Sequence, residues 1–249
     1  MLSLFAPSLL SSSLQWLLRF ALPWACAGCR TPLRSTDDEG FCGRCWLTIP
    51  RIQGLICAYC GLPLKEGGQQ CFDCRTTPSG VLIRAAAIYG GPLRPAIHRF
   101  KYLGRVSLSK PLGNLMCSAW DKRAELRDIQ ALVPVPGHPA NERRRGYNQA
   151  TLLAKAIEKQ LNKPVLEGLL IASPARPPQS SLNKEERKKA VKNAFAVNHA
   201  DRLKRLIKGK SFLLVDDVAT TTSTLNACGR ALRLAGAKSV KALVLARDL

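Results

Sequence analysis

Residues 212–224 read FLLVDDVATTTST, and this stretch decides the fold of the 249-residue chain. The apolar run at residues 212–215 is too short for a helix and is typical of a buried strand in a parallel sheet. After it, apolar residues recur at a helical period from Ser223 to Gly236, and residues 240–245 read as the next strand. The stretch therefore predicts a strand–helix–strand unit, the building block of an α/β fold.

The two carboxylates in this stretch indicate a binding site. Asp216 and Asp217 are expected to leave the strand at its carboxyl end, where ligands of parallel α/β sheets bind. The start of the helix adds free N–H groups and partial positive charge, and the hydroxyls at residues 220–224 add donors. A phosphate fits these donors, while the carboxylates accept from sugar hydroxyls, directly or through a divalent metal ion. We therefore expect a site for a sugar phosphate.

Two other interpretations of the acid pair compete with this one. A strand followed by two aspartates also occurs in P-loop NTPases, which need G-x-x-x-x-G-K-[ST] after an earlier strand. Gly209-Lys210-Ser211 resembles the end of that motif, but Lys204 replaces its first glycine and the tripeptide precedes a strand. The P-loop interpretation is therefore discarded. A purely structural pair that caps the turn stays open, although adjacent carboxylates repel each other without a cation or donors.

The rest of the chain after residue 79 continues the α/β pattern. We expect a mostly parallel sheet with helices on both faces over residues 80–249. The polar, proline-containing stretch at residues 173–192 predicts a mobile loop over the site. Hydrophobic periodicity predicts strands at 81–89, 131–135 and 166–171, the start of a helix at 95–102 and a second helix at 149–160.

Eight of the ten cysteines form four Cys-x-x-Cys pairs within a domain predicted at residues 26–79. Each pair can turn two thiolates toward one ion, and two pairs complete a closed tetrahedral Zn²⁺ site. Such regular pairs, without a convincing export signal, favour two structural zinc ions in a reducing, cytoplasmic compartment over disulfides. Grouping in sequence order is the simpler assignment, and an interleaved grouping stays open. The predicted ligands are Cys26, Cys29, Cys42, Cys45, Cys57, Cys60, Cys71 and Cys74.

Together these motifs resemble the ComF/GntX family, and the acid pair with its turn resembles the phosphoribosyl-pyrophosphate signature of type I phosphoribosyltransferases. The resemblance covers roughly residues 22–249 and implies a phosphoribosyltransferase-like, Rossmann-like domain preceded by a double zinc ribbon. Besides the acid pair and the cysteines, it rests on Lys101-Tyr102 with Gly104, on residues 133–136 leading to residues 145–149, and on residues 192–195.

The resemblance also implies roles for individual residues. Asp216 and Asp217 match ribose-binding acids, and Mg²⁺ accompanies the phosphoribosyl ligand. Arg145 and Asn148 belong to the pyrophosphate loop, and Lys101 is a candidate substrate contact. The 5′-phosphate loop comprises Ala219, Thr220, Thr221, Thr222, Ser223 and Thr224.

Three departures from the family pattern bear on catalysis. Thr222 stands where the phosphate loop usually has glycine, which is used there for close backbone approach or positive φ. Ala172 and Pro174 stand where arginines are common, and Ala190 stands where asparagine is usual. The loop expected to close over the substrate is therefore altered, and we distinguish binding of a phosphoribosyl ligand from its transfer.

The first 25 residues are strongly apolar, yet they read as neither a signal peptide nor a membrane span. No basic region precedes the apolar residues, and Arg19 interrupts them. We expect an amphipathic segment packed on the protein, and weak contact with a partner or a membrane surface stays open.

Positive charge is concentrated in the second part of the chain. The formal net charge is +21, and residues 99–249 hold 29 basic and 12 acidic side chains, a net charge of +17. Such a field favours polyanions such as nucleotides or nucleic acid. Aromatic residues are few, and only Tyr147 lies beside the basic run at residues 143–145, so the sequence indicates no stacking platform for single strands.

Two functions follow, and the residues do not decide between enzyme and binding protein. The first is a magnesium-dependent phosphoribosyltransferase acting on phosphoribosyl pyrophosphate, which would hold its reactants in line and stabilise the leaving pyrophosphate. The second, implied by the family resemblance, is a catalytically inactive nucleic-acid-binding component of DNA uptake or DNA utilisation. Its partners would be single-stranded DNA and DNA-uptake proteins.

Overall fold

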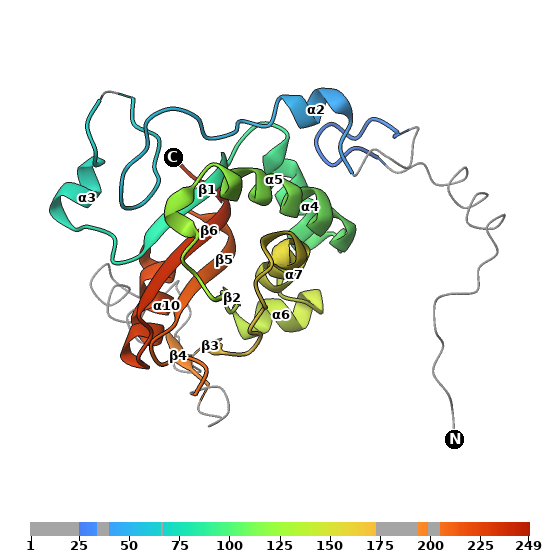
Figure 1. The fold of residues 1–249 in the computed structure, drawn as a ribbon. Coiled ribbons are helices and arrows are strands. Elements are labelled where there is room, and N and C mark those ends of the chain that lie inside the picture. The colour runs from blue at the N-terminus through green and yellow to red at the C-terminus, as the bar shows by residue number, and fades with distance from the viewer. Residues whose placement is uncertain (1–24, 34–39, 66, 173–193, 199–204) are drawn as a thin grey trace, which may run out of the picture.

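A parallel four-stranded sheet organises the chain (Figure 1). The computed structural model describes residues 25–33, 40–65, 67–172, 194–198 and 205–249. Every neighbouring pair of strands in this sheet is parallel, which confirms the predicted α/β fold class. In spatial order the strands are β1 (Leu82–Ile88), β6 (Ser239–Arg247), β5 (Ser211–Ala219) and β2 (Ala131–Pro134).

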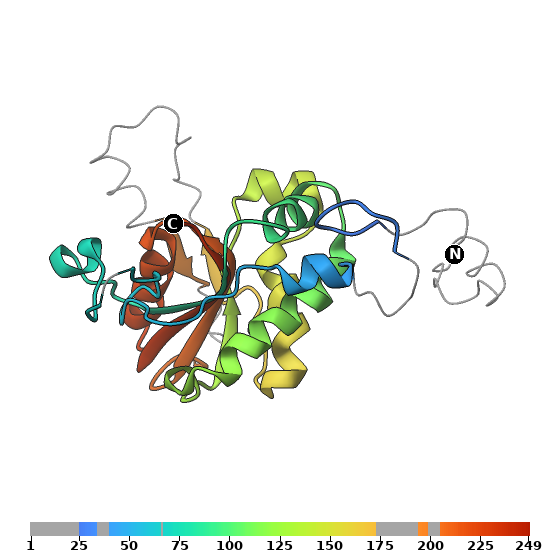
Figure 2. The same ribbon diagram turned by 90° about the horizontal axis from the view of Figure 1, so that it is seen from above.

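Helices cover both faces of this sheet (Figures 1 and 2). One face carries α4 (Leu93–Tyr102), α5 (Ser109–Asp121) and α7 (Gln149–Leu161), and the other carries α10 (Ser223–Leu234). The short helix α6 (Pro139–Arg145) follows β2, and single 3₁₀ turns lie at Val106–Leu108 and Ala124–Leu126.

Each face of the sheet has its own apolar core, because successive side chains of a strand point to opposite faces. In β5, Leu213 and Val215 belong to the core beneath α4, α5 and α7. Phe212 and Leu214 belong to the core beneath α10. Continued along the strand, this alternation places Asp217 on the first face and Asp216 on the second.

The strand that carries the acid pair is longer than the sequence predicts. β5 continues to Ala219 because its register with β6 extends to the pair Ala219↔Arg247. Asp216 and Asp217 therefore lie inside the last part of the strand instead of beyond its end, which corrects the expectation above.

Other element boundaries also differ from the prediction. The segment expected to start a helix, residues 95–102, is the body of α4, which begins at Leu93 and ends at Tyr102. The strand predicted at residues 166–171 begins only at Leu170: β3 (Leu170–Ala172) pairs antiparallel with β4 (Phe195–Val197) in a separate two-stranded sheet. The loop predicted at residues 173–192 and almost all of the amphipathic segment predicted at residues 1–25 lie outside the described residues.

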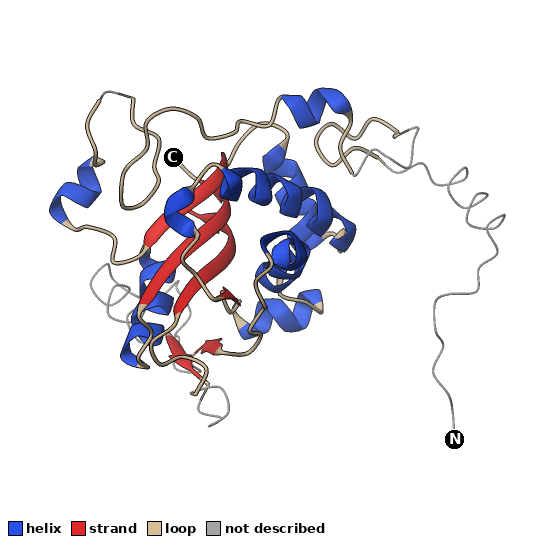
Figure 3. Cartoon of the chain, in the orientation of Figure 1, coloured by secondary structure: helices blue, strands red, loops and turns tan. Residues whose placement is uncertain are grey.

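The cysteine-rich segment runs along the edge of the sheet next to β1 and carries two short helices, α2 (Gly43–Leu47) and α3 (Phe72–Thr76) (Figure 3). Backbone hydrogen bonds from Ile88 N to Pro50 O (2.7 Å) and from Ile83 N to Tyr59 O (2.9 Å) tie this segment to β1. It therefore covers an edge that would otherwise present unpaired backbone groups. The domain boundary predicted near residue 79 falls between α3 and β1.

No helix in the described part of the chain is both long enough and apolar enough to cross a lipid bilayer.

Candidate functional site

The eight paired cysteines gather into two clusters of four. Their sulfur atoms lie within 4.8 Å of one another in each cluster, with the groups following sequence order: 26/29/42/45 and 57/60/71/74. The sulfurs of Cys29 and Cys42 are 3.8 Å apart, and those of Cys60 and Cys71 are 3.6 Å apart. A tetrahedral zinc with Zn–S bonds of about 2.3 Å needs sulfurs about 3.8 Å apart, so both clusters fit the ion. The interleaved grouping is excluded.

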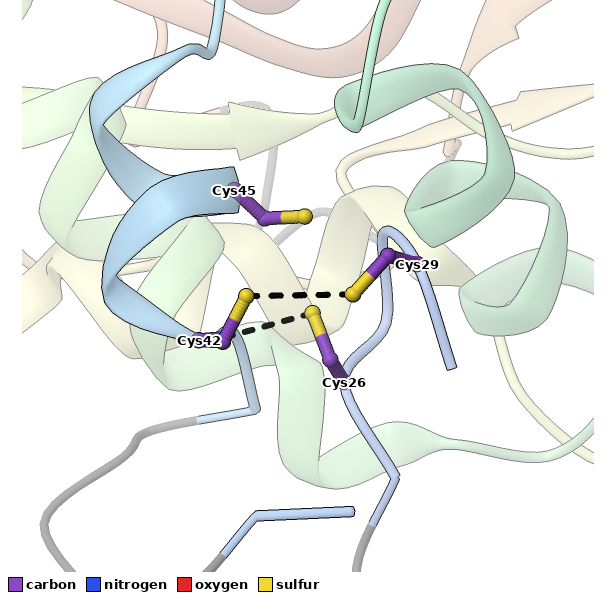
Figure 4. Close-up of side chains that lie close together, drawn as sticks. All are labelled: Cys26, Cys29, Cys42 and Cys45. Carbon is purple, nitrogen blue, oxygen red and sulfur yellow. Dashed lines mark hydrogen bonds between the residues drawn. The ribbon is translucent and has the colours of Figure 1, made fainter. Parts of the chain in front are cut away.

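In each cluster, hydrogen bonds lower the pKa of some thiols and burial raises the pKa of others. In the first cluster the four side chains converge on one point, and the N–H of Cys42 donates to Cys26 Sγ at 3.2 Å (Figure 4). The Thr31 hydroxyl, 3.1 Å from Cys29 Sγ, lowers the pKa of Cys29 to about 6. In the second cluster burial opposes ionisation, but backbone N–H groups prevail and lower the pKa of Cys57 to about 6. Metal ligation requires the thiolate form, so Cys29 and Cys57 are the thiols most ready to bind zinc. Burial raises the pKa of Cys45, Cys60 and Cys74, and these thiols would give up their protons on binding the ion.

The acid pair lies beside a lysine from α4. The Lys101 ammonium is 2.9 Å from Asp217 Oδ2, and the Asp217 side chain is only 5% exposed. Burial opposes the charge on Lys101, but Asp217 and then Asp216 outweigh it and raise the pKa of the lysine. The structure therefore brings Lys101 and Asp217, distant in sequence, into one ion pair at the carboxyl end of the sheet.

Asp216 has a different environment. Its Oδ1 accepts from the N–H of Asp217 at 2.8 Å. Burial, followed by the charge of Asp217, raises the pKa of Asp216 to about 8. The two carboxylates stand on opposite faces of the strand, so a ligand could reach both only by lying across the end of the sheet.

The hydroxyl-rich turn joins β5 to α10, as the sequence predicts. Thr222 is the N-cap residue with φ −81°, and its side chain caps no helix N–H. Its hydroxyl instead accepts from Asn226 Nδ2 at 3.1 Å. Thr222 adopts an ordinary right-handed conformation, so the positive φ for which glycine is used is not required here. The start of α10 thus keeps N–H groups available to an anion.

A cavity of about 380 Å³ opens at the end of α4. The guanidinium carbons of Arg145 and Arg144 lie 4.7 Å and 5.8 Å from the centre of the Tyr102 ring. The Tyr147 hydroxyl donates to the carbonyl of Phe100 in α4, and Arg145 Nε is buried and has no hydrogen-bond partner among the described residues. The lining residues are Lys101, Tyr102, Gly104, Arg144, Arg145 and Tyr147.

Helix α6 ends in a way that brings its arginines to this cavity. Gly146 follows α6 in the left-handed region, with φ 80°, and reverses the chain directly after Arg145. Lys101 lines the cavity and also pairs with Asp217, so a cationic pocket and the acid pair adjoin. This arrangement can hold an anionic group next to carboxylates that can accept hydrogen bonds from hydroxyl groups.

Comparison with known proteins identifies both parts of the chain. The double zinc ribbon domain family matches residues 17–75, and the phosphoribosyl transferase domain family matches residues 149–249. Competence protein F of Haemophilus influenzae is 30% identical over 226 residues, covering 89% of this chain and 96% of that protein. The chain belongs to the ComF family.

Two further proteins are similar to this ComF-family chain. The DNA utilization protein YhgH of Escherichia coli K12 is 29% identical over 232 residues, covering 92% of this chain and 99% of that protein. Among solved structures, the glutamine phosphoribosylpyrophosphate amidotransferase of B. subtilis complexed with ADP and GMP is 18% identical with a TM-score of 0.36. That match covers 55% of this chain and 25% of the amidotransferase chain.

The predicted site residues of this ComF-family chain are used in different ways. Lys101, Asp217 and Arg145 converge as described. Asn148 instead caps α7: its Oδ1 accepts from Ala150 N at 2.8 Å, and its Nδ2 donates to Glu142 Oε1 at 2.7 Å. Ala172 lies at the end of β3, and Pro174 and Ala190 lie outside the described residues.

Sequence analysis named motifs that contain Tyr102, Arg144 and Tyr147 but did not bring these residues together in the site of this ComF-family chain. They line the cavity, although they come from separate elements. Arg247, the last residue of β6, donates to the carbonyls of Ala219 and Thr220 in the turn. No local motif marks Arg247, and sequence analysis missed it.

Proposed function

We propose that this ComF-family protein binds Mg²⁺ and phosphoribosyl pyrophosphate, or a related nucleotide, at the carboxyl end of the parallel sheet. One observation carries the proposal: Lys101 belongs both to the ion pair with Asp217 and to the cavity lined by arginines and tyrosines. A ligand with a hydroxyl-bearing sugar between two phosphoryl groups needs this combination, because its hydroxyls require acceptors and its phosphates require cations and N–H donors.

The proposal assigns each part of the ligand to one part of the site. The turn at residues 219–224 takes the 5′-phosphate, and Asp216 and Asp217 accept from the ribose hydroxyls. Lys101 and Arg145 face the pyrophosphate, and Asn148 supports that region by capping α7. Asp216 would also hold Mg²⁺ together with the phosphates of the ligand, whose charge the ion neutralises when bound. The fit of the ion follows from Asp216, whose carboxyl gives up its proton more readily beside a cation.

The proposed function is binding of the phosphoribosyl ligand, and transfer of the phosphoribosyl group would require a further substrate. Transfer requires the chain to hold an acceptor in line with the ribose carbon while the pyrophosphate leaves. Lys101 and Arg145, which both line the cavity, would stabilise that leaving anion, so no nucleophilic side chain is required. An acceptor that consumes phosphoribosyl pyrophosphate in the presence of the protein would establish the enzyme.

The proposal extends to the whole chain. Residues 26–79 form a double ribbon with two structural zinc ions, and residues 80–249 carry the ligand. A cytoplasmic location suits eight reduced cysteines. The names of the relatives, competence protein F and DNA utilization protein, support a role for this ligand site in DNA uptake or DNA utilisation.

Asp217→Asn tests the proposal. The change removes the negative charge of the carboxylate that pairs with Lys101 and would accept hydrogen bonds from the ribose hydroxyls. The affinity for phosphoribosyl pyrophosphate with Mg²⁺ should therefore fall at least about tenfold. Calorimetric titration of the zinc-loaded protein measures this. Asp128→Asn is the matched control, since Asp128 is an exposed carboxylate that pairs with Lys241. Equal affinity in the Asp217 variant and the wild type would rule the proposal out.

A second candidate ligand is single-stranded DNA, and a specific surface favours it. Cations and rings alternate along α4: Arg94 lies 5.9 Å from the Tyr89 ring, and the His98 and Tyr102 rings are 4.9 Å apart. Arg144 and Arg145 continue this surface across Tyr102. Stacked bases and phosphates need such an alternation. Sequence analysis indicated no stacking platform, because aromatic residues are few and Arg144 and Arg145 approach Tyr102 only in the folded chain.

A further inference from the structure

Arg247 is a buried cation that the proposed ligand contacts leave unexplained. It is the last residue of β6 and is 6% exposed. Among the described residues no carboxylate forms a salt bridge with it, and its Nε is buried without a hydrogen-bond partner. A buried charge without a counter-ion is costly, so this position calls for a nearby anion.

The guanidinium of Arg247 forms hydrogen bonds with the turn that follows β5. Its Nη1 donates to the carbonyl of Ala219 at 2.6 Å and to the carbonyl of Thr220 at 2.8 Å. The N–H of Asp248 also donates to the Ala219 carbonyl, at 3.1 Å. Two successive carbonyls are thereby turned toward the end of β6.

Fixing these carbonyls also fixes the amides that follow them. In a trans peptide the C=O of one residue and the N–H of the next point in opposite directions, and the described residues contain no cis peptide bond. The N–H groups of Thr220 and Thr221 must therefore point away from Arg247. In the described part of the chain neither N–H donates a hydrogen bond. Together with the uncapped start of α10, they form a set of unsatisfied donors.

Arg247 is itself held in place from the neighbouring strand. Its carbonyl accepts from Tyr89 N at 2.8 Å, and its backbone stands in register with Ile88 of β1 and Ala219 of β5. The arginine is thus anchored on a rigid part of the sheet, while the turn it holds is exposed at Thr220 and Thr221.

We propose that Arg247 is the positioning residue of a phosphate site at residues 219–223. It turns the amides of Thr220 and Thr221 toward the anion and supplies a buried positive charge behind the turn. The inference rests on the proposed function, because it assigns to this turn the 5′-phosphate of the phosphoribosyl ligand. It adds a residue from the neighbouring strand β6, outside the acid pair, the turn and the cavity.

Two ligands separate the two halves of the site in a calorimetric test. Ribose 5-phosphate reports on the turn, and inorganic pyrophosphate with Mg²⁺ reports on the region of Lys101 and Arg145. Arg247→Met should weaken ribose 5-phosphate binding about 10- to 100-fold, the value of one or two charge-assisted contacts, and leave pyrophosphate binding within about twofold. Arg247→Lys, which keeps the charge and donors, should recover most of the loss.

Arg84→Met is the matched control for a lost buried arginine. Arg84 is also 6% exposed, but it pairs with Glu125 at 2.6 Å and lies in the first half of β1. The Arg84→Met substitution should lower the melting temperature without changing the affinity for ribose 5-phosphate. Unchanged ribose 5-phosphate affinity in Arg247→Met overturns the inference. It is also overturned if Arg247→Met and Arg247→Lys both weaken the binding of ribose 5-phosphate and of pyrophosphate to the same extent. A wild-type protein that binds neither ligand overturns the proposed function, and the inference with it.

Discussion

At the scale of single residues, the site depends on charges placed where burial makes them effective. Lys101 gains its position from α4, and Asp217 gains its position from β5, so the sequence alone does not show that the two side chains pair. The adjacent Asp216 shows the cost of this arrangement, because burial and the charge of Asp217 raise its pKa to about 8. A bound cation would offset that cost, which links the acid pair to a ligand and not only to stability.

The raised pKa of Asp216 predicts a pH dependence of folding. Between its ordinary pKa near 4 and about 8, only the folded state keeps the proton, so raising the pH favours the unfolded state. The free energy of unfolding of the zinc-loaded, magnesium-free protein should fall between pH 5 and pH 8, by at most about 1.4 kcal/mol per pH unit. Urea unfolding at several pH values measures it. Asp216→Asn should remove this dependence, and parallel curves for variant and wild type would contradict the assignment.

At the scale of elements, local patterns predicted the strand–helix–strand unit around residues 212–245, because each of its elements carries its own periodicity. The predicted end of β5 was wrong because the end of this strand depends on its pairing with β6, which lies outside a local window of the sequence. Helix α5 escaped prediction because Pro111 and Gly113 imitate a turn. Pro111 lies in the first helical turn, where it is tolerated, and Gly113 allows α7 to approach so closely that a Cβ would lie 2.8 Å from that of Ala156.

A local sequence window also does not contain both α4 and α6, so the sequence did not reveal the surface that these helices share. This surface leads to a prediction about single-stranded DNA. Removing two phosphate contacts from a single strand should reduce the slope of log affinity against log salt by about 1.4. We expect this change for the double variant Arg144→Ala with Arg145→Ala, measured by fluorescence anisotropy with a labelled oligonucleotide at several salt concentrations. Lys159→Ala, in the exposed last turn of α7, is the control and should leave the slope nearly unchanged. Identical slopes for the double variant and the wild type would exclude this surface.

At the scale of the whole molecule, the two cysteine clusters are not equivalent. Cys26 and Cys45 belong to the same apolar core as Leu93 and Phe100 of α4, whereas the second cluster forms a small core of its own with Leu62 and Leu64. Arginines that flank Lys101 reinforce the first connection: Arg99 donates to the carbonyl of Ala27, and Arg105 donates to the carbonyl of Ala25 at 2.7 Å. The first cluster thus supports the helix that carries Lys101.

Loss of the first zinc should therefore affect both folding and ligand binding. Cys42→Ser should lower the melting temperature by about 10 °C or more, because the metal contributes folding free energy to a core shared with α4. It should also weaken phosphoribosyl pyrophosphate binding severalfold through the displaced Lys101. Cys71→Ser should release one zinc with little change in that affinity, since its cluster packs separately. Cys117→Ala, a buried cysteine outside both clusters, is the control for zinc content. Calorimetric binding and metal analysis of the three variants decide the matter: equal affinity in Cys42→Ser and Cys71→Ser would mean that the first cluster stabilises only its own segment.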